Sequence, residues 1–153
     1  YGMVLPNFVA AAVEGRDLPI HGDGRQARCF CDVRDVVEVL PRLLHAPACH
    51  GRVFNIGSDR SMTIEQLADA VIAQTGSRSG KRFVSYEAAY ARGFEDLRER
   101  VPDLTRVREA IGFSPKRPLE ETIRDIALSM NGAAVAPPPG SFPVAPVRAG
   151  DAR

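Results

Sequence analysis

Apolar residues near the start of the chain recur at helical spacing. One side of a helix over residues 3–14 collects Val4, Leu5, Phe8, Ala12 and Val13. Pro6 stands in the first turn, where a missing N–H costs no hydrogen bond, and Gly15 follows the last turn. The pattern predicts a helix that ends at Gly15.

A β-hairpin is predicted next. Residues 18–21 and 27–31 each have the composition of a short strand, and the tripeptide Gly22-Asp23-Gly24 between them is a strong turn signal. Glycine adopts the positive φ that tight turns require. We therefore expect the two strands to pair with each other.

The period becomes helical again after Asp32. Over residues 33–44 the apolar positions are Val33, Val36, Val37, Leu40 and Leu44. Pro41 lies inside this segment and should kink the helix or end it early. The next segment, 52–57 with the sequence RVFNIG, has the branched and aromatic residues of a buried strand.

The second half of the sequence predicts three more helices. Thr63 and Gln66 form a capping box, followed by an apolar stripe that ends before Gly76. Asp103 should cap a helix over 104–111 that ends at Gly112, and residues 119–130 predict a last helix.

Shorter segments fill the space between these helices. Residues 81–85 predict a strand, 87–92 a short helix and 93–101 a charged loop. The region 132–153 is rich in Pro and Ala, which predicts a disordered tail. About five helices and three or four short strands make the chain a mixed α and β protein.

Composition narrows the class of protein. The chain has 153 residues, which is enough for one domain. With 20 Lys+Arg against 19 Asp+Glu it is nearly neutral, and this lack of a basic surplus argues against a nucleic-acid-binding protein. Three cysteines are too few for a disulfide scaffold and fit a reducing compartment, with the cytoplasm as the default. There is no membrane-spanning run and no signal peptide, so a soluble protein is expected. Tyr1 is not an initiator methionine, and we expect further sequence upstream.

Two motifs that could carry chemistry are weak. The segment 22–27 formally matches the G-x-G-x-x-G/A fingerprint of dinucleotide sites, but strand-like residues follow it, so a tight turn is the better interpretation. A zinc site from Cys29, Cys31 and the pair Cys49-His50 lacks the usual C-x-x-C spacing, and buried free thiols are the better interpretation. The Tyr-x-x-x-Lys pair of short-chain dehydrogenases is absent.

The arginines give a clearer signal. Arg28 alternates with Phe30 on the predicted return strand, so a guanidinium and a ring should point to one side, opposite to the cysteines. A fork of N–H donors beside an aromatic ring suits a phosphate or diphosphate. Arg98 and Arg100 lie in the charged loop. Each arginine alone is also compatible with an ordinary surface ion pair.

Taken together, several segments resemble a known family. They are LPIHGDGRQARCFCDVRDVVEVL, GRVFNIGS, TIEQLADAVIAQTG, GFEDLRERVPDL and IGFSPKRPLEETI, in this order from residue 1 to about 130. Their order and spacing resemble the C-terminal part of extended short-chain dehydrogenase/reductases, the NAD-dependent nucleotide-sugar epimerases, dehydratases and decarboxylases. The GFEDLRERVPDL segment looks especially like UDP-glucuronate decarboxylases and UDP-glucose 4-epimerases.

The resemblance implies an architecture. Residues 1–131 would form the mixed α+β substrate-binding lobe of an extended Rossmann-type α/β enzyme, followed by the tail. The doubly wound NAD-binding domain, with its glycine-rich loop and Tyr-x-x-x-Lys pair, would lie upstream, so this chain alone would hold no NAD and supply no catalytic residue.

The resemblance also implies site residues. Arg28 and Arg100 match the arginines that contact the diphosphate of a UDP-sugar, and Ile20 and His21 would edge the nucleobase pocket. The chain is therefore expected to be the UDP-sugar-binding portion of an enzyme, and whether it is an enzyme by itself is left open. The alternative function is a non-catalytic interaction module derived from that lobe, which pairs with itself or with a separate Rossmann-domain chain.

Overall fold

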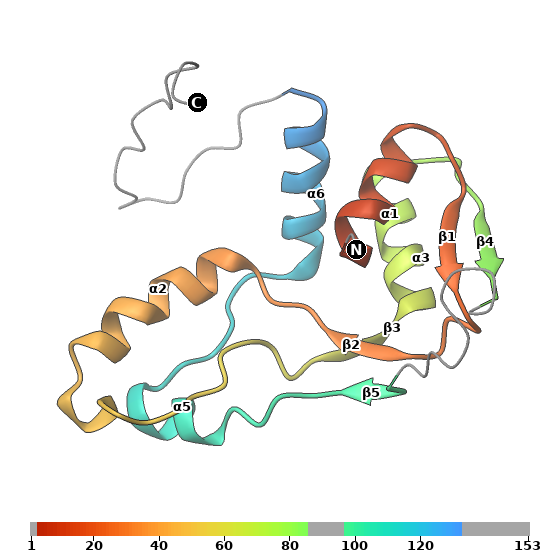
Figure 1. Ribbon diagram of the computed structural model, residues 1–153. Helices are drawn as coiled ribbons and strands as arrows, with labels where there is room; N and C mark the ends of the chain where they lie inside the picture. The colour runs from red at the N-terminus through yellow and green to blue at the C-terminus, as the bar shows by residue number, and fades with distance from the viewer. Residues whose placement is uncertain (1–2, 86–96, 133–153) are drawn as a thin grey trace, which may run out of the picture.

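The computed structural model describes residues 3–85 and 97–132 (Figure 1). Its elements in chain order are α1 Val4–Val13, β1 Leu18–His21, β2 Ala27–Cys29, α2 Val33–Leu44, the 3-10 helix η1 Pro47–Cys49, β3 Ser61–Thr63, α3 Ile64–Thr75, β4 Lys81–Val84, β5 Glu99–Arg100, α5 Thr105–Ile111 and α6 Leu119–Met130. The predicted helix 87–92, part of the charged loop and nearly all of the predicted tail lie outside the described residues.

The predicted helix ends are confirmed where the sequence carries a capping signal. Gln66 N–H donates to Thr63 Oγ1 at 3.1 Å and Thr63 N–H donates to Gln66 Oε1 at 2.8 Å, which completes the capping box of α3. Gly76 ends α3 with φ 64°, in the left-handed region. Asp103 accepts from Thr105 N–H at 2.9 Å, but α5 begins one residue later than predicted, so the N-cap position is Leu104 and not Asp103.

The predicted hairpin is wrong. β1 pairs in parallel with β4, whereas β2 lies between β3, to which it is antiparallel, and β5, to which it is parallel. The reason is that the turn after β1 is tied to the start of α3: Glu65 N–H donates to Gly24 O at 3.0 Å and Ile64 N–H donates to Gln26 O at 3.0 Å. The chain therefore leaves β1 and enters a second sheet, with β2 ending at Cys29, before Phe30.

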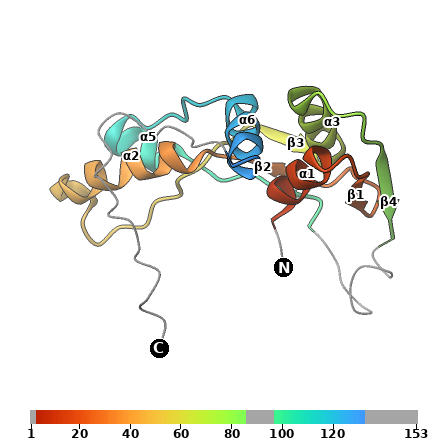
Figure 2. The same ribbon diagram turned by 90° about the horizontal axis from the view of Figure 1, so that it is seen from above.

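Two hydrophobic clusters organise the fold, and they lie at opposite ends of the molecule (Figures 1 and 2). The main core joins α1, α3 and α6 to β1, and its fully buried side chains include Phe8, Leu18, Ile20, Leu67 and Ile123. The second cluster joins α2 to α5 and the chain around it through the buried residues Val39, Leu104, Val107 and Phe113. The sheet β3-β2-β5 runs between the two clusters.

Two segments around the second cluster test predictions from the sequence. Pro41 does not end α2, which continues to Leu44, and Pro41 O accepts from His45 N–H at 3.0 Å. The predicted strand 52–57 forms no ladder with any strand of the described residues, and Val53 is 77% exposed. Strand-forming side chains specify a strand only where a neighbouring strand offers backbone partners, and segment 52–57 has none among the described residues.

Within residues 3–85 and 97–132, no helix has the length and apolar character needed to cross a membrane.

Candidate functional site

The fold brings Arg28 and Arg100 together. They are register partners in the parallel pairing of β2 with β5, and on the other side of β2 the register partner of Arg28 is Met62. Register partners on adjacent strands project from the same face of a sheet. The row Met62, Arg28, Arg100 therefore places two guanidinium groups from distant parts of the sequence on one face.

Each arginine of this pair is held differently. Arg28 is half-buried, and its Nη1 donates to Ala27 O at 2.7 Å and to Leu97 O at 2.8 Å. Arg100 is exposed, and its side chain makes no hydrogen bond or ion pair with another described residue. Like charges directly opposite each other on a sheet repel, so a bound anion would stabilise this arrangement.

The acidic neighbour of Arg100 does not neutralise the pair. Glu99 is the register partner of Ala27, one residue along each strand, so it projects from the other face of the sheet. Its Oε1 accepts from Ser61 Oγ at 2.9 Å. The Glu99 carboxylate is therefore not on the face that carries the two arginines.

The other two predicted site residues lie on β1. Ile20 has no exposed surface and belongs to the main core, so it supports the strand from inside. His21 is partly exposed, and its backbone oxygen accepts from Gln26 Nε2 at 2.7 Å. That Ile20 and His21 edge a nucleobase pocket stays a prediction.

The glycines of the 22–27 segment serve the fold, as the tight-turn interpretation predicts. Gly22 and Gly24 have φ of 74° and 73°. A Cβ on Gly24 would lie 3.1 Å from Ile20 Cγ2, 3.2 Å from Glu65 Cβ and 3.3 Å from Phe83 Cε1. Close packing of the turn against α3 and β4 therefore requires glycine at position 24.

The start of α3 next to this turn is not built for a dinucleotide. A pyrophosphate site needs free N–H groups at a helix N-terminus. The first three N–H groups of α3 already donate to Gln26 O, Gly24 O and Thr63 Oγ1. The residues at this turn therefore do not fit NAD.

The cysteines do not form a metal site within the described residues, where no group of three or more potential ligands was found. Burial raises the pKa of both Cys29 and Cys31; Asp59 and Glu99 add to the rise at Cys29, and Asp35 and Asp32 at Cys31. Cys49 is buried. The prediction of buried free thiols is thus confirmed for Cys49, whereas Cys29 and Cys31 are free but only partly buried. Their raised pKa values keep the thiols of Cys29 and Cys31 protonated near neutral pH.

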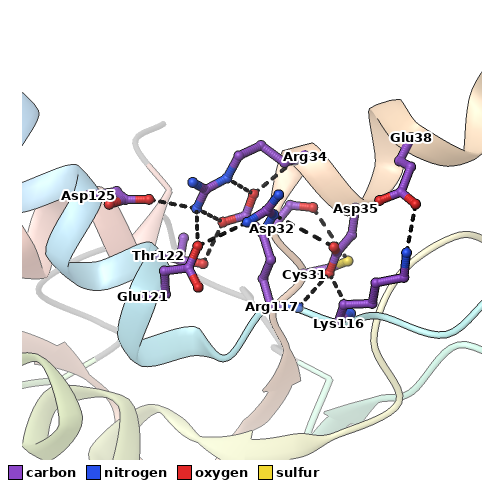
Figure 3. A network of polar contacts seen from close by, with 10 residues as sticks. All are labelled: Cys31, Asp32, Arg34, Asp35, Glu38, Lys116, Arg117, Glu121, Thr122 and Asp125. Atoms are coloured by element: carbon purple, nitrogen blue, oxygen red, sulfur yellow. Dashed lines mark hydrogen bonds and ion pairs between the residues drawn. The ribbon is translucent and has the colours of Figure 1, made fainter. Parts of the chain in front are cut away.

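A polar network that the sequence analysis missed joins α2 to α6 (Figure 3). Asp32 is 5% exposed and caps α2 by accepting from Arg34 N–H at 2.8 Å. Its carboxylate also accepts from Arg34 Nε and Nη2, at 2.8 and 2.7 Å, and from Thr122 Oγ1 of α6 at 2.7 Å. Arg34 in turn reaches Asp125 of α6 at 2.6 Å.

These contacts shift both ionisable groups toward their charged forms. The hydrogen bonds from Arg34 hold the pKa of Asp32 well below its usual range, against the opposing effect of burial. The bond to Asp32 raises the pKa of Arg34 in the same way. The signal in the sequence was the position of Asp32 just before an apolar helical segment. This position predicts a helix cap, but it does not predict the contacts with α6.

Asp35 continues the network toward the segment before α6. It is 3% exposed, and its Oδ2 accepts from the backbone N–H groups of Lys116 and Arg117 at 2.9 and 3.1 Å. A buried carboxylate is thus paired with two backbone donors from 81 and 82 positions further along the chain. Asp32 and Asp35 together fix α2 against α6.

Two cavities adjoin these residues. A cavity of about 240 Å³ lies beside Met62, the neighbour of Arg28 in the row, and its lining includes Arg60 and Arg117. A larger groove of about 600 Å³ lies between α1, α6 and the start of α2. Arg117 lines both.

Comparison with known proteins identifies the family. Residues 2–126 match the family described as GDP-mannose 4,6 dehydratase. The chain belongs to this family. It is 35% identical over 125 residues to a UDP-N-acetyl-alpha-D-glucosaminuronate decarboxylase from Bacillus cytotoxicus, a match that covers 82% of this chain and 39% of the relative.

Solved structures of the family share the fold. A UDP-glucose 4-epimerase from Thermotoga maritima, solved with UDP-glucose, has 28% identity and a TM-score of 0.71, covering 86% of this chain and 41% of that one. A dTDP-glucose 4,6-dehydratase from Bacillus anthracis, solved with NAD, has 22% identity and a TM-score of 0.69, covering 85% and 39%.

The expected fold class and family are thus confirmed: the chain is a mixed α/β protein that matches the C-terminal portion of extended short-chain dehydrogenase/reductases. It spans about two fifths of the length of these relatives.

Proposed function

We propose that this chain forms the nucleotide-sugar-binding portion of an NAD-dependent epimerase, decarboxylase or dehydratase. The observation that carries the proposal is the register pairing of Arg28 with Arg100 on adjacent strands. Their side chains leave one face of the sheet, where two guanidinium forks match the two phosphates of a nucleoside diphosphate. A UDP-sugar is the proposed ligand, since the Thermotoga relative was solved with UDP-glucose.

In this proposal the residues have separate roles. Arg28 and Arg100 bind the diphosphate, and His21, supported by Ile20, edges the nucleobase. The neighbouring cavity of about 240 Å³ is smaller than the roughly 300–1,000 Å³ of typical small-molecule sites. The described residues therefore form one wall of the site, and the remainder comes from elsewhere in the enzyme.

The redox cofactor would also be bound elsewhere. NAD supplies hydride transfer in enzymes of this type. The occupied N–H groups at the start of α3 argue against a dinucleotide site at the glycine turn. We therefore propose that residues outside this chain hold NAD and that the chain alone does not catalyse the reaction.

A titration of UDP and UDP-glucuronate into the purified chain tests this proposal. Hydrogen bonds to charged groups contribute roughly 1.5–3 kcal/mol each, so the double variant Arg28→Ala, Arg100→Ala should bind at least about a hundredfold more weakly. Arg106→Ala, which removes an exposed arginine of α5, is the matched control and should bind as the wild type does.

The result that contradicts this assignment is binding that both variants retain equally, because it would place the diphosphate away from the two arginines. If a folded wild-type chain bound neither ligand, even with the NAD-binding portion of a relative supplied, the proposed function itself would be wrong.

The alternative function, a non-catalytic interaction module, has one observation in its favour. Helix α2 exposes several large apolar side chains, among them Val33 and Leu44 at 69% and 70%. Exposed apolar surface of this kind marks interaction sites.

A further inference from the structure

Strand β5 carries Arg100 and is the shortest strand among the described residues. It consists of Glu99–Arg100 and pairs with β2. The side chain of Arg100 makes no hydrogen bond or ion pair with another described residue, so the backbone of β5 sets its position. The contacts that hold this backbone against the sheet therefore decide where the second guanidinium of the proposed diphosphate site lies.

A side-chain hydrogen bond connects β5 to the far strand of the same sheet. The strand order is β3-β2-β5, with β2 in the centre (Figure 1). Ser61 of β3 is the register partner of Cys29, and Glu99 of β5 is the register partner of Ala27. Ser61 Oγ donates to Glu99 Oε1 at 2.9 Å. This bond therefore passes across β2 and joins the two outer strands.

The bond lies on the face opposite the two arginines. Ala27 and Cys29 flank Arg28 on β2, so their side chains and those of their register partners leave the other face of the sheet. Burial raises the pKa of the Cys29 thiol, and the Asp59 and Glu99 carboxylates add to the rise, as expected of a carboxylate that crosses β2. A side chain held on this face fixes the next residue of β5 on the other.

Two further contacts hold the chain just before β5. Ala27 N–H donates to Arg98 O at 2.7 Å, and Arg28 Nη1 donates to Leu97 O at 2.8 Å. Both contacts act on the backbone that leads into the strand. The bond from Ser61 acts on β5 itself, at the residue next to the exposed guanidinium.

We propose that Glu99 is a positioning residue for Arg100, because its bond with Ser61 holds β5 in the register that sets two guanidinium groups side by side for a diphosphate. This inference rests on the proposed function. A role as a charge alone predicts the opposite effect on affinity, since a nearby carboxylate repels a diphosphate and its removal would strengthen binding. Positioning predicts that removal of the Glu99 side chain weakens binding.

Titration of UDP into purified variants of the chain separates the two roles. Glu99→Ala and Ser61→Ala each remove the bond and should weaken binding about three- to tenfold, as expected for one hydrogen bond. Glu99→Gln loses the charge but keeps an oxygen that can accept from Ser61, so it should bind at least as tightly as the wild type. Glu109→Ala, which removes an exposed glutamate of α5, is the matched control and should bind as the wild type does.

Two further measurements test the mechanism. The double variant Ser61→Ala, Glu99→Ala should bind UDP no more weakly than the weaker single variant, because both changes break the same bond. Amide hydrogen exchange reports the position of β5 without ligand, since the N–H of Ala27 donates to Arg98 O. Exchange at Ala27 should become faster in both alanine variants and stay unchanged in Glu99→Gln. Circular dichroism spectra verify that the variants are folded.

The positioning role would be overturned, and the proposed function left standing, if Glu99→Ala bound UDP as tightly as the wild type or more tightly. Equally weak binding by Glu99→Gln and Glu99→Ala, or unchanged exchange at Ala27 in the alanine variants, would also overturn it. A folded wild-type chain that bound no UDP, even with the NAD-binding portion of a relative supplied, would instead contradict the proposed function and the positioning role together.

Discussion

The two ends of the molecule bury their apolar residues to different degrees. The cluster of α1, β1, α3 and α6 encloses twelve buried side chains, whereas the described residues of the cluster around α2 and α5 contribute four. Each helix of the first cluster packs against the other two. Helix α2, in contrast, has an apolar stripe that the described residues leave exposed, formed by Val33, Val37, Leu40 and Leu44.

The difference shows what the apolar pattern of a helix does and does not specify. In α3 the apolar stripe predicted from the sequence faces the core, since Leu67, Ala68 and Val71 are fully buried. In α2 an equally regular stripe stays exposed, and the buried positions are Val39 and the polar residue Asp35. Periodicity predicts that a helix has an apolar face, and the remainder of the fold decides whether that face is covered.

The largest expected effect compares one leucine from each cluster. Leu67 and Leu104 are both buried, at 0% and 2% exposure. Leu67→Ala should lower the free energy of unfolding by about 3–5 kcal/mol, and Leu104→Ala by about 2–3 kcal/mol, because the smaller cluster can collapse around the cavity more easily. Urea unfolding of the two variants measures the difference, and equal losses would contradict the contrast between the clusters.

The next largest effect concerns the polar contacts between α2 and α6, which connect the two ends of the molecule. Asp32→Ala removes the cap of α2 and the buried partner of Arg34 and Thr122, so the free energy of unfolding should fall by roughly 3 kcal/mol. Glu38→Gln, which removes an exposed ion pair with Lys116, is the control and should leave stability unchanged.

The same carboxylate predicts a pH dependence. The pKa of Asp32 is lower in the folded chain than in the unfolded chain. Its contribution to stability is therefore fully present above the unfolded pKa, about 4, and is lost as the pH falls below that value. Acid titration of stability should be shallower in Asp32→Ala than in the wild type, and parallel curves would show that Asp32 is not the group responsible.

The smallest effect compares the side-chain hydrogen bonds at the starts of α3 and α5. Thr63→Ala breaks the capping box of α3 and should cost about 1 kcal/mol. Asp103→Ala removes one bond to the start of α5, against the two reciprocal bonds of the capping box, and should cost less. Thermal unfolding of both variants gives the order, and a larger loss for Asp103→Ala would reverse the expected ranking.

The candidate site was predictable in part. Arg28, Arg100, Ile20 and His21 were named from motifs, yet the pairing of Arg28 with Arg100 could not be derived from residue patterns, since it joins strands 72 positions apart in the chain. The network of Asp32, Arg34 and Asp125 was missed for the same reason: each partner looks like an ordinary surface residue in the sequence.

The sequence by itself determined most of the helix ends within the described residues. Gly15, Gly76 and Gly112 end helices with positive φ or follow them directly, and the bounds of α6 are those that its apolar pattern predicts. These signals act within one or two helical turns, so they can be recognised without knowledge of the fold.

Only the tertiary structure decided which strands pair and which apolar faces are covered. Residues 18–21 and 27–29 both form strands, but hydrogen bonds from the start of α3 to the intervening turn direct them into different sheets. Segment 52–57 has strand-forming residues and no ladder, and α2 has an apolar stripe that no described residue covers. A helix makes its backbone hydrogen bonds within its own segment, whereas a strand depends on partners from distant parts of the chain.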